Sequence, residues 1–62
     1  MNQYNCFFTR TVGDVAEFVI IEADGDDQAR MMADAILREQ ANYASVEIYA
    51  DERVLGRIER AA

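Results

Sequence analysis

Histidine, proline, lysine and tryptophan are all missing from this chain of 62 residues, and cysteine occurs only once, as Cys6. A single cysteine excludes a disulfide within the chain. A lone thiol without imidazole partners cannot build a structural zinc site, and no histidine is present to convert the thiol into a nucleophilic thiolate. We therefore expect no metal, no cofactor and no catalytic residue, and we predict that the protein is not an enzyme.

Long apolar runs are also missing. The longest, Phe18 to Ile21, has four residues, whereas a membrane-spanning helix needs about 20. The chain begins at Met1 without the basic and apolar segments of a secretory signal. We expect a cytoplasmic protein that does not contact a membrane.

Positive charge is scarce, because twelve acidic residues stand against six basic ones and the net charge is −6. Proteins that bind nucleic acid directly present a basic face to the phosphates, so we expect no nucleic-acid partner. The acidic run from Glu22 to Asp27 does not match a calcium-binding EF-hand loop, because the twelfth position would be Ala33 or Ala35 instead of a glutamate. Capping of a helix by solvated carboxylates explains this run.

The small size of the chain favours association. A domain of about 60 residues buries only about 60% of its unfolded surface and is marginally stable alone. Domains of this size gain stability from disulfides, metals or oligomerisation, and only oligomerisation is compatible with this composition. We expect one domain over residues 1–62 that forms a homodimer.

Residue periodicity predicts an α+β fold of order β-β-α-β-β, in which a four-stranded antiparallel sheet carries one helix on one face. Aromatic and β-branched residues typical of strands occur at about 3–11, 15–22, 45–49 and 53–60. A turn is expected at Val12-Gly13-Asp14. The order of the strands within the sheet stays open.

A helix is expected over residues 25–41, with Asp24 as its N-cap and Asn42 as its C-cap. Apolar residues recur in this segment at helical spacing, namely Ala29, Met32, Ala33, Ile36 and Leu37. The arginines near the end of the chain, Arg53, Arg57 and Arg60, are interpreted as solvated strand residues that form surface ion pairs.

The second strand is apolar on both of its alternating faces. Side chains of a strand point alternately to opposite sides of the sheet, so one apolar set packs beneath the helix and the other has no helix to cover it. A three-residue loop pairs Phe8 with Phe18 and Phe7 with Val19, so that like residues meet on each face. We predict that the helix-facing set contains Tyr4, Cys6, Phe8, Phe18, Ile20, Val46, Ile48, Val54 and Ile58.

The second hairpin allows two registers. A two-residue turn at Asp51-Glu52 would place Val46 beside Arg57, whereas a three-residue loop separates apolar from charged residues. We predict the three-residue loop, which places Ile48 opposite Val54.

The side of the sheet away from the helix, the outer face, is the candidate interaction surface. Its apolar area is expected to be too large for contact with bulk water, and two arginines are expected to form a polar rim together with Glu47. Val15 is expected on the same face. The candidate interface residues are Phe7, Val19, Ile21, Tyr49, Leu55, Arg53 and Arg57.

Three segments carry a resemblance to known proteins: Glu22–Arg30 (EADGDDQAR), Val46–Tyr49 (VEIY) and Arg53–Ile58 (RVLGRI). In this order they resemble short uncharacterised bacterial or phage β-β-α-β-β proteins, in which a capped helix leads into a C-terminal hairpin. The resemblance covers about residues 18–60. It implies the fold and a bacterial or phage source, and it supplies no catalytic residue.

Two functional hypotheses follow. The leading one is a small non-enzymatic protein-interaction module that self-associates through the outer face. The alternative is an acidic phage-type inhibitor or nucleic-acid mimic, whose carboxylates bind a basic surface of another protein. Salt distinguishes them, because attraction between charges weakens with ionic strength whereas apolar burial is little affected by modest salt.

Overall fold

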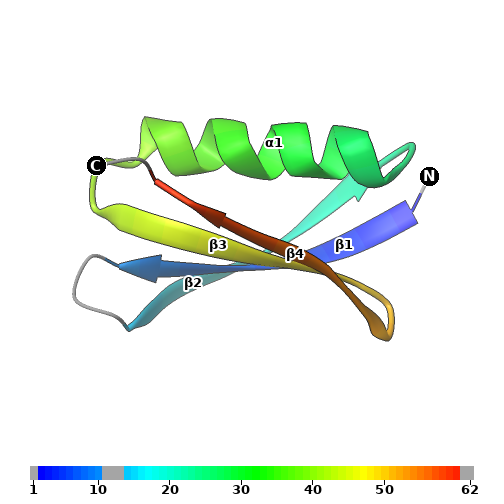
Figure 1. Ribbon diagram of the computed structural model, residues 1–62, viewed down its shortest axis with the longest axis horizontal. Coiled ribbons are helices and arrows are strands. Elements are labelled where there is room, and N and C mark those ends of the chain that lie inside the picture. The colour runs from blue at the N-terminus through cyan, green and yellow to red at the C-terminus, as the bar shows by residue number, and fades with distance from the viewer. Residues whose placement is uncertain (1, 11–13, 61–62) are drawn as a thin grey trace.

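The computed structural model describes residues 2–10 and 14–60. The four strands form one antiparallel sheet, and a helix lies across one side of it (Figure 1). The predicted α+β fold and its β-β-α-β-β order are confirmed. The turn expected at residues 12–14 lies mostly outside the described residues. In chain order the elements are β1 (Asn2–Arg10), β2 (Val15–Ala23), α1 (Asp26–Glu39), β3 (Tyr43–Ala50) and β4 (Arg53–Glu59).

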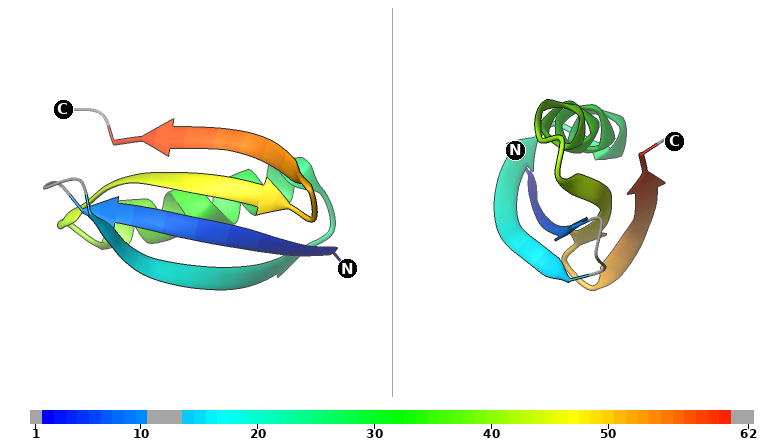
Figure 2. Two further views of the ribbon diagram at one scale, coloured as in Figure 1. Left: turned by 90° about the horizontal axis from the view of Figure 1, so that it is seen from below. Right: turned by 90° about the vertical axis from the view of Figure 1, so that its left-hand side faces the viewer.

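The order of the strands in the sheet is β2-β1-β3-β4. The two hairpins therefore lie side by side, with β1 and β3 in the centre and β2 and β4 at the edges. The helix packs on β3, β2 and β1, whereas β4 projects beyond it on one side (Figure 2). One side of the sheet is therefore covered by α1, and the outer face is not.

The core lies between α1 and the strands beneath it. Ala29, Ala33 and Leu37 are the buried residues of α1, and the small alanine side chains allow the helix to lie close to the sheet. The helical spacing predicted this stripe, although Met32 at its flank is 37% exposed. The buried core residues of the strands are Tyr4, Cys6, Phe8, Ile21, Ala23, Tyr43, Val46, Ile48 and Ala50.

The N-terminus of α1 is not capped by the side chain that the sequence suggested. Gly25 is the N-cap residue, and Asp24 lies one position earlier, where its backbone N–H donates to Oε1 of Gln28 at 2.5 Å. Asp26 and Asp27 occupy the first turn, where the helix dipole stabilises negative charge.

The C-terminus of α1 is capped by Arg60. The helix ends at Glu39, before the predicted cap at Asn42. The interpretation of Arg60 as a solvated strand residue is wrong, because β4 ends at Glu59 and the next side chain turns toward the end of the helix. The Arg60 guanidinium donates hydrogen bonds to the backbone carbonyls of Leu37, Gln40 and Tyr43.

The register of the first hairpin differs from the prediction by one residue. Phe7, and not Phe8, lies opposite Phe18, and a bulge shifts the register beyond Phe8. A shift of one residue turns every side chain of a strand to the other face. Val19 and Ile21 therefore point toward the helix, while Phe18 and Ile20 are 50% and 54% exposed. The prediction failed because β2 is apolar on both faces, so its pattern does not distinguish the two registers.

The second hairpin has the two-residue turn of one expected register, but beyond a bulge its pairing matches neither of the two. Its turn has two residues, Asp51 and Glu52, because Ala50 pairs with Arg53, and a bulge then shifts the register so that Ile48 pairs with Gly56. Gly56 has a φ of 152°, a conformation that glycine adopts without steric cost. The predicted three-residue loop is therefore wrong. As a consequence, Val54 points outward and is 62% exposed, while Leu55 packs against the core and Ile58 does so as predicted.

Candidate interaction surface

An apolar cluster covers much of the outer face. Phe7 is its centre, because its ring centroid lies 4.9 Å from that of Phe18 and 5.5 Å from that of Tyr49, which it meets edge to face. Such ring pairs contribute about 0.5–1.5 kcal/mol beyond the area that they bury. We call the set the outer-face cluster, and its residues are Phe7, Val15, Phe18, Ile20, Tyr49 and Val54.

The strand pairing makes this cluster continuous across the sheet. One row of opposed residues runs from β2 to β4 as Phe18, Phe7, Glu47 and Arg57. The next row runs as Ile20, Asn5, Tyr49 and Val54. The half of the outer face on β1 and β2 is therefore mostly apolar, whereas the half on β3 and β4 contains a carboxylate and a guanidinium.

A shallow groove of about 350 Å³ crosses the same face. In Figure 1 the start of β2 and the turn between β3 and β4 both bend away from α1, at opposite ends of the sheet. Two aromatic side chains and two carboxylates border the groove. The groove is lined by Asn5, Phe7, Val15, Glu47, Tyr49 and Asp51.

Three of the candidate interface residues lie on the outer face as expected. Phe7 and Tyr49 belong to the outer-face cluster, and Arg57 lies beside it. The Arg57 guanidinium donates to Oγ of Ser45 at 3.2 Å and forms an ion pair of 3.5 Å with Glu59.

The other four candidates lie on the opposite side of the sheet, so their expected placement is corrected. Val19, Ile21 and Leu55 pack against the core because of the two bulges. Arg53 reaches the start of α1, where its guanidinium lies 3.6 Å from a carboxylate oxygen of Asp26.

Phe18, Ile20 and Val54 lie on the outer face, although the sequence pattern predicted them in the core. Their apolar character was visible, but each was assigned to the core by a register one residue away from the real one. The only available signal was that β2 contains two apolar sets. That signal predicts an apolar outer face in either register without identifying its residues.

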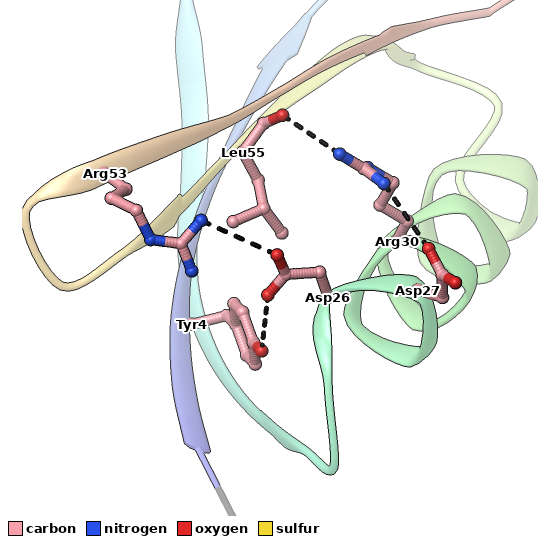
Figure 3. Close-up of polar contacts among 6 residues, drawn as sticks. All are labelled: Tyr4, Asp26, Asp27, Arg30, Arg53 and Leu55. Carbon is pink, nitrogen blue, oxygen red and sulfur yellow. Dashed lines mark hydrogen bonds and ion pairs between the residues drawn. The ribbon is translucent and has the colours of Figure 1, made fainter.

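A polar cluster joins the start of α1 to the sheet (Figure 3). The Tyr4 hydroxyl donates to Oδ1 of Asp26 at 3.0 Å. Burial and this hydrogen bond raise the pKa of Tyr4 above its ordinary value of 10.0, while the same bond and Arg53 lower the pKa of Asp26 from 3.8. Both shifts move away from neutral pH, so neither group exchanges protons there, and the cluster acts as a structural connection.

A second connection fixes α1 to β4. Arg30 donates to the backbone carbonyl of Leu55 at 3.2 Å and lies 3.5 Å from a carboxylate oxygen of Asp27 (Figure 3). Because β4 projects beyond the helix, these polar side chains span the space between them.

The single thiol is not available for chemistry. Cys6 is completely buried in the core. Burial raises the pKa of its thiol, which favours the neutral form and lowers nucleophilicity. Among the described residues, no three acidic, cysteine or histidine side chains gather to hold a metal ion. Within the same part of the chain, no helix is long and apolar enough to cross a membrane.

Acidic residues gather at the end of the molecule where α1 begins. The end of β2, the start of α1 and the turn between β3 and β4 all lie at this end (Figure 1). Arg30 and Arg53 offset part of this negative charge through their ion pairs with Asp27 and Asp26. The carboxylates at this end are Glu22, Asp24, Asp26, Asp27, Asp51 and Glu52.

Comparisons with protein-family models, with curated protein sequences and with solved structures find no match to this chain. The functional conclusion therefore rests on the surface described above.

Proposed function

We propose that this protein is a small non-enzymatic interaction module that self-associates by burying its outer-face cluster against a second copy. The observation that carries the proposal is the exposure of large apolar side chains on one continuous surface. Val15, Phe18, Ile20 and Val54 are each at least 50% exposed, and the aromatic contacts of Phe7 join the cluster across three strands. Apolar patches of this kind mark interaction sites on small proteins.

The polar half of the outer face supports a partner with the same surface. Glu47 and Arg57 lie opposite each other on neighbouring strands, and the described ion pairs of Arg57 involve Glu59 and not Glu47. In a two-fold symmetric pair the same patch occurs on both copies, so Arg57 of one copy can approach Glu47 of the other. This arrangement matches the polar rim that surrounds the apolar centre of many interfaces.

The dimensions of the molecule limit the strength of this contact. The sheet spans the longest and the shortest extents of the molecule, 32 and 15 Å (Figure 2), so the outer face measures roughly 500 Å², against about 800 Å² per partner in a standard interface. We therefore expect a concentration-dependent association in the micromolar range and not a permanent complex.

The test compares two exposed apolar residues on opposite sides of the molecule. Val54 belongs to the outer-face cluster and is 62% exposed, whereas Met31 of α1 is 72% exposed on the far side. We expect Val54→Arg to halve the mass measured by light scattering, because a charge cannot be buried without a partner. Met31→Arg introduces the same charge and should leave the mass unchanged.

The outcome that contradicts the proposal is equal mass for the native chain and Val54→Arg across the micromolar range. Circular dichroism of both variants checks that they remain folded. Val19→Glu is unsuitable for this test, because Val19 packs against the core and a carboxylate buried there would unfold the protein.

The acidic end of the molecule supports a second candidate function, binding to a basic surface of another protein. Six of the twelve carboxylates lie at that end. An immobilised chain should then retain a lysine-rich peptide at low salt and release it at high salt. Asp51→Asn together with Glu52→Gln should weaken retention, whereas Glu39→Gln at the other end of α1 should not. Equal retention by both variants contradicts this candidate.

A further inference from the structure

The two edges of the sheet differ in how they are protected against pairing with another strand. An exposed edge presents unpaired backbone N–H and C=O groups, and proteins block such edges with charged side chains and bulges. The edge strand β4 has both devices. Its bulge at Gly56 interrupts the regular backbone, and Arg53, Arg57 and Glu59 place charges along its seven residues.

The opposite edge, β2, lacks this protection along its centre. It is nine residues long, and the stretch from Phe18 to Ile21 has no charged residue. Its register irregularity lies near its start, before this stretch. Among the described residues, no strand pairs with the outer side of β2.

The helix adds apolar surface beside the same edge. Asp34 and Arg38 line a groove with Ile58 of β4, so this flank of α1 faces β4. Met32 and Ile36 lie on the opposite flank by helical spacing, and that flank faces β2. Met32 is 37% exposed, which leaves an apolar side chain above the unprotected edge.

We propose that β2 pairs antiparallel with β2 of a second copy and extends the sheet to eight strands. The two-fold axis passes through Val19, the midpoint of the strand Val15–Ala23, because this register gives the longest overlap. It places Phe18 of one copy opposite Ile20 of the other on the outer face. It also places neither Glu17 nor Glu22 opposite another carboxylate. Like charges directly opposite each other would destabilise the strand pair.

Edge pairing also enlarges the outer face. It joins two outer faces of roughly 500 Å² each, so the combined surface exceeds the roughly 800 Å² per partner of a standard interface. Two such eight-stranded sheets can then stack through their outer-face clusters to form a tetramer. The stacking step rests on the proposed function, whereas the edge pairing stands on the properties of β2 alone.

The first test measures mass for the native chain and for Val54→Arg. One copy has a mass of 7.0 kDa. We expect a native tetramer that Val54→Arg converts to a dimer, because Val54 lies on the outer face of β4, far from the β2 edge. A native dimer that becomes a monomer overturns the edge pairing and leaves the proposed function intact. A dimer that Val54→Arg does not change overturns the proposed function instead, and a native monomer overturns both.

The second test is residue-resolved amide exchange of the native chain. Alternate amides of β2 point away from β1, and amides without a hydrogen-bond partner exchange rapidly. Edge pairing should slow the outward amides between residues 17 and 21 by about tenfold or more as the concentration rises through the association range. Stacking of faces alone leaves these amides fast, and that result in an associated sample overturns the proposal.

The third test checks the register by crosslinking. Val19→Cys places two thiols on the two-fold axis, where opposed residues of antiparallel strands lie about 4.5–5.5 Å apart, within the range of a disulfide. Mild oxidation should give a covalent dimer. Ile20→Cys is the matched control, because its two thiols are offset along the strands and should not crosslink. Efficient crosslinking of Ile20→Cys and not of Val19→Cys contradicts the proposed register. The native Cys6 is buried and is present in both variants.

Discussion

Removal of the Arg60 side chain tests whether one residue near the chain end holds the last turn of α1. Its guanidinium donates to the carbonyl oxygens of Gln40 at 2.6 Å and Tyr43 at 2.8 Å, and also to that of Leu37. The last four carbonyls of a helix have no partner within the helix. Of the three acceptors, Leu37 and Gln40 lie at the end of α1 and Tyr43 begins β3. Arg60→Ala leaves the Gln40 carbonyl with only the Tyr43 N–H as donor, removes the hydrogen bonds to Leu37 and Tyr43, and takes a positive charge from the negative end of the helix dipole.

The expected cost is large for so small a protein. A hydrogen bond from a charged donor contributes about 1.5–3 kcal/mol, and a cation at a helix C-terminus contributes about 0.3–1 kcal/mol. Because Arg60 is only partly buried and divides one guanidinium among three acceptors, we expect a total loss of about 2 kcal/mol. The whole free energy of unfolding of a 62-residue chain is about 3–9 kcal/mol. The loss should lower Tm by about 8–16 °C.

Thermal unfolding followed by circular dichroism measures this effect, with all proteins at one concentration. Arg38→Ala is the matched control, because Arg38 lies in the last turn of α1 and pairs with Asp34 at 2.8 Å, but its side chain is 76% exposed. Such a surface ion pair contributes only a small part of the loss expected for Arg60→Ala, so Arg38→Ala should lower Tm by about 4 °C at most. Equal shifts for the two variants would refute the capping role of Arg60.

Three further predictions concern the core, the polar cluster at the start of α1 and the bulge of β4. The thiol of Cys6 should not react with a thiol reagent in the native protein and should react fully in denaturant, and rapid native labelling would contradict its burial. Asp26→Asn should reduce the free energy of unfolding at pH 7, and less so in acid. The reason is that the lowered pKa of Asp26 gives a stabilisation that is present above the ordinary value and lost as the pH falls through the folded value. Urea titrations at pH 7 and pH 3 check the sign. Gly56→Ala should cost about 1–3 kcal/mol through backbone strain at its φ of 152°. Because open space surrounds the added Cβ, an unchanged urea midpoint would show that the bulge can adopt another conformation.

The helix could be predicted from the sequence because its signals are local. Ala29, Ala33 and Leu37 recur at helical spacing, and all three are buried. The caps could not be predicted in the same way. Arg60 lies 23 residues after Leu37, and only the order β2-β1-β3-β4, with β4 beside the end of α1, brings its guanidinium to the helix.

The positions of the strands were also visible in the sequence, but the faces of β2 and β4 were not. Val19 and Phe18 are both apolar, so either can face the core without breaking the pattern. The bulges determine which side chains of β2 and β4 face the core, and each bulge depends on the backbone geometry of the whole hairpin. For this reason the core residues predicted on β1 and β3 were placed correctly, as was Ile58 of β4, whereas Phe18, Ile20 and Val54 were wrongly assigned to the core.

The sequence by itself determined the elements, their order and the existence of a second apolar side on β2, because hydrophobic periodicity and strand or helix propensity act over a few neighbouring positions. The tertiary structure alone decided which side chains form the outer-face cluster, which edge is open and what caps the helix. Those features depend on strand register, where a single inserted residue reverses the direction of every side chain that follows.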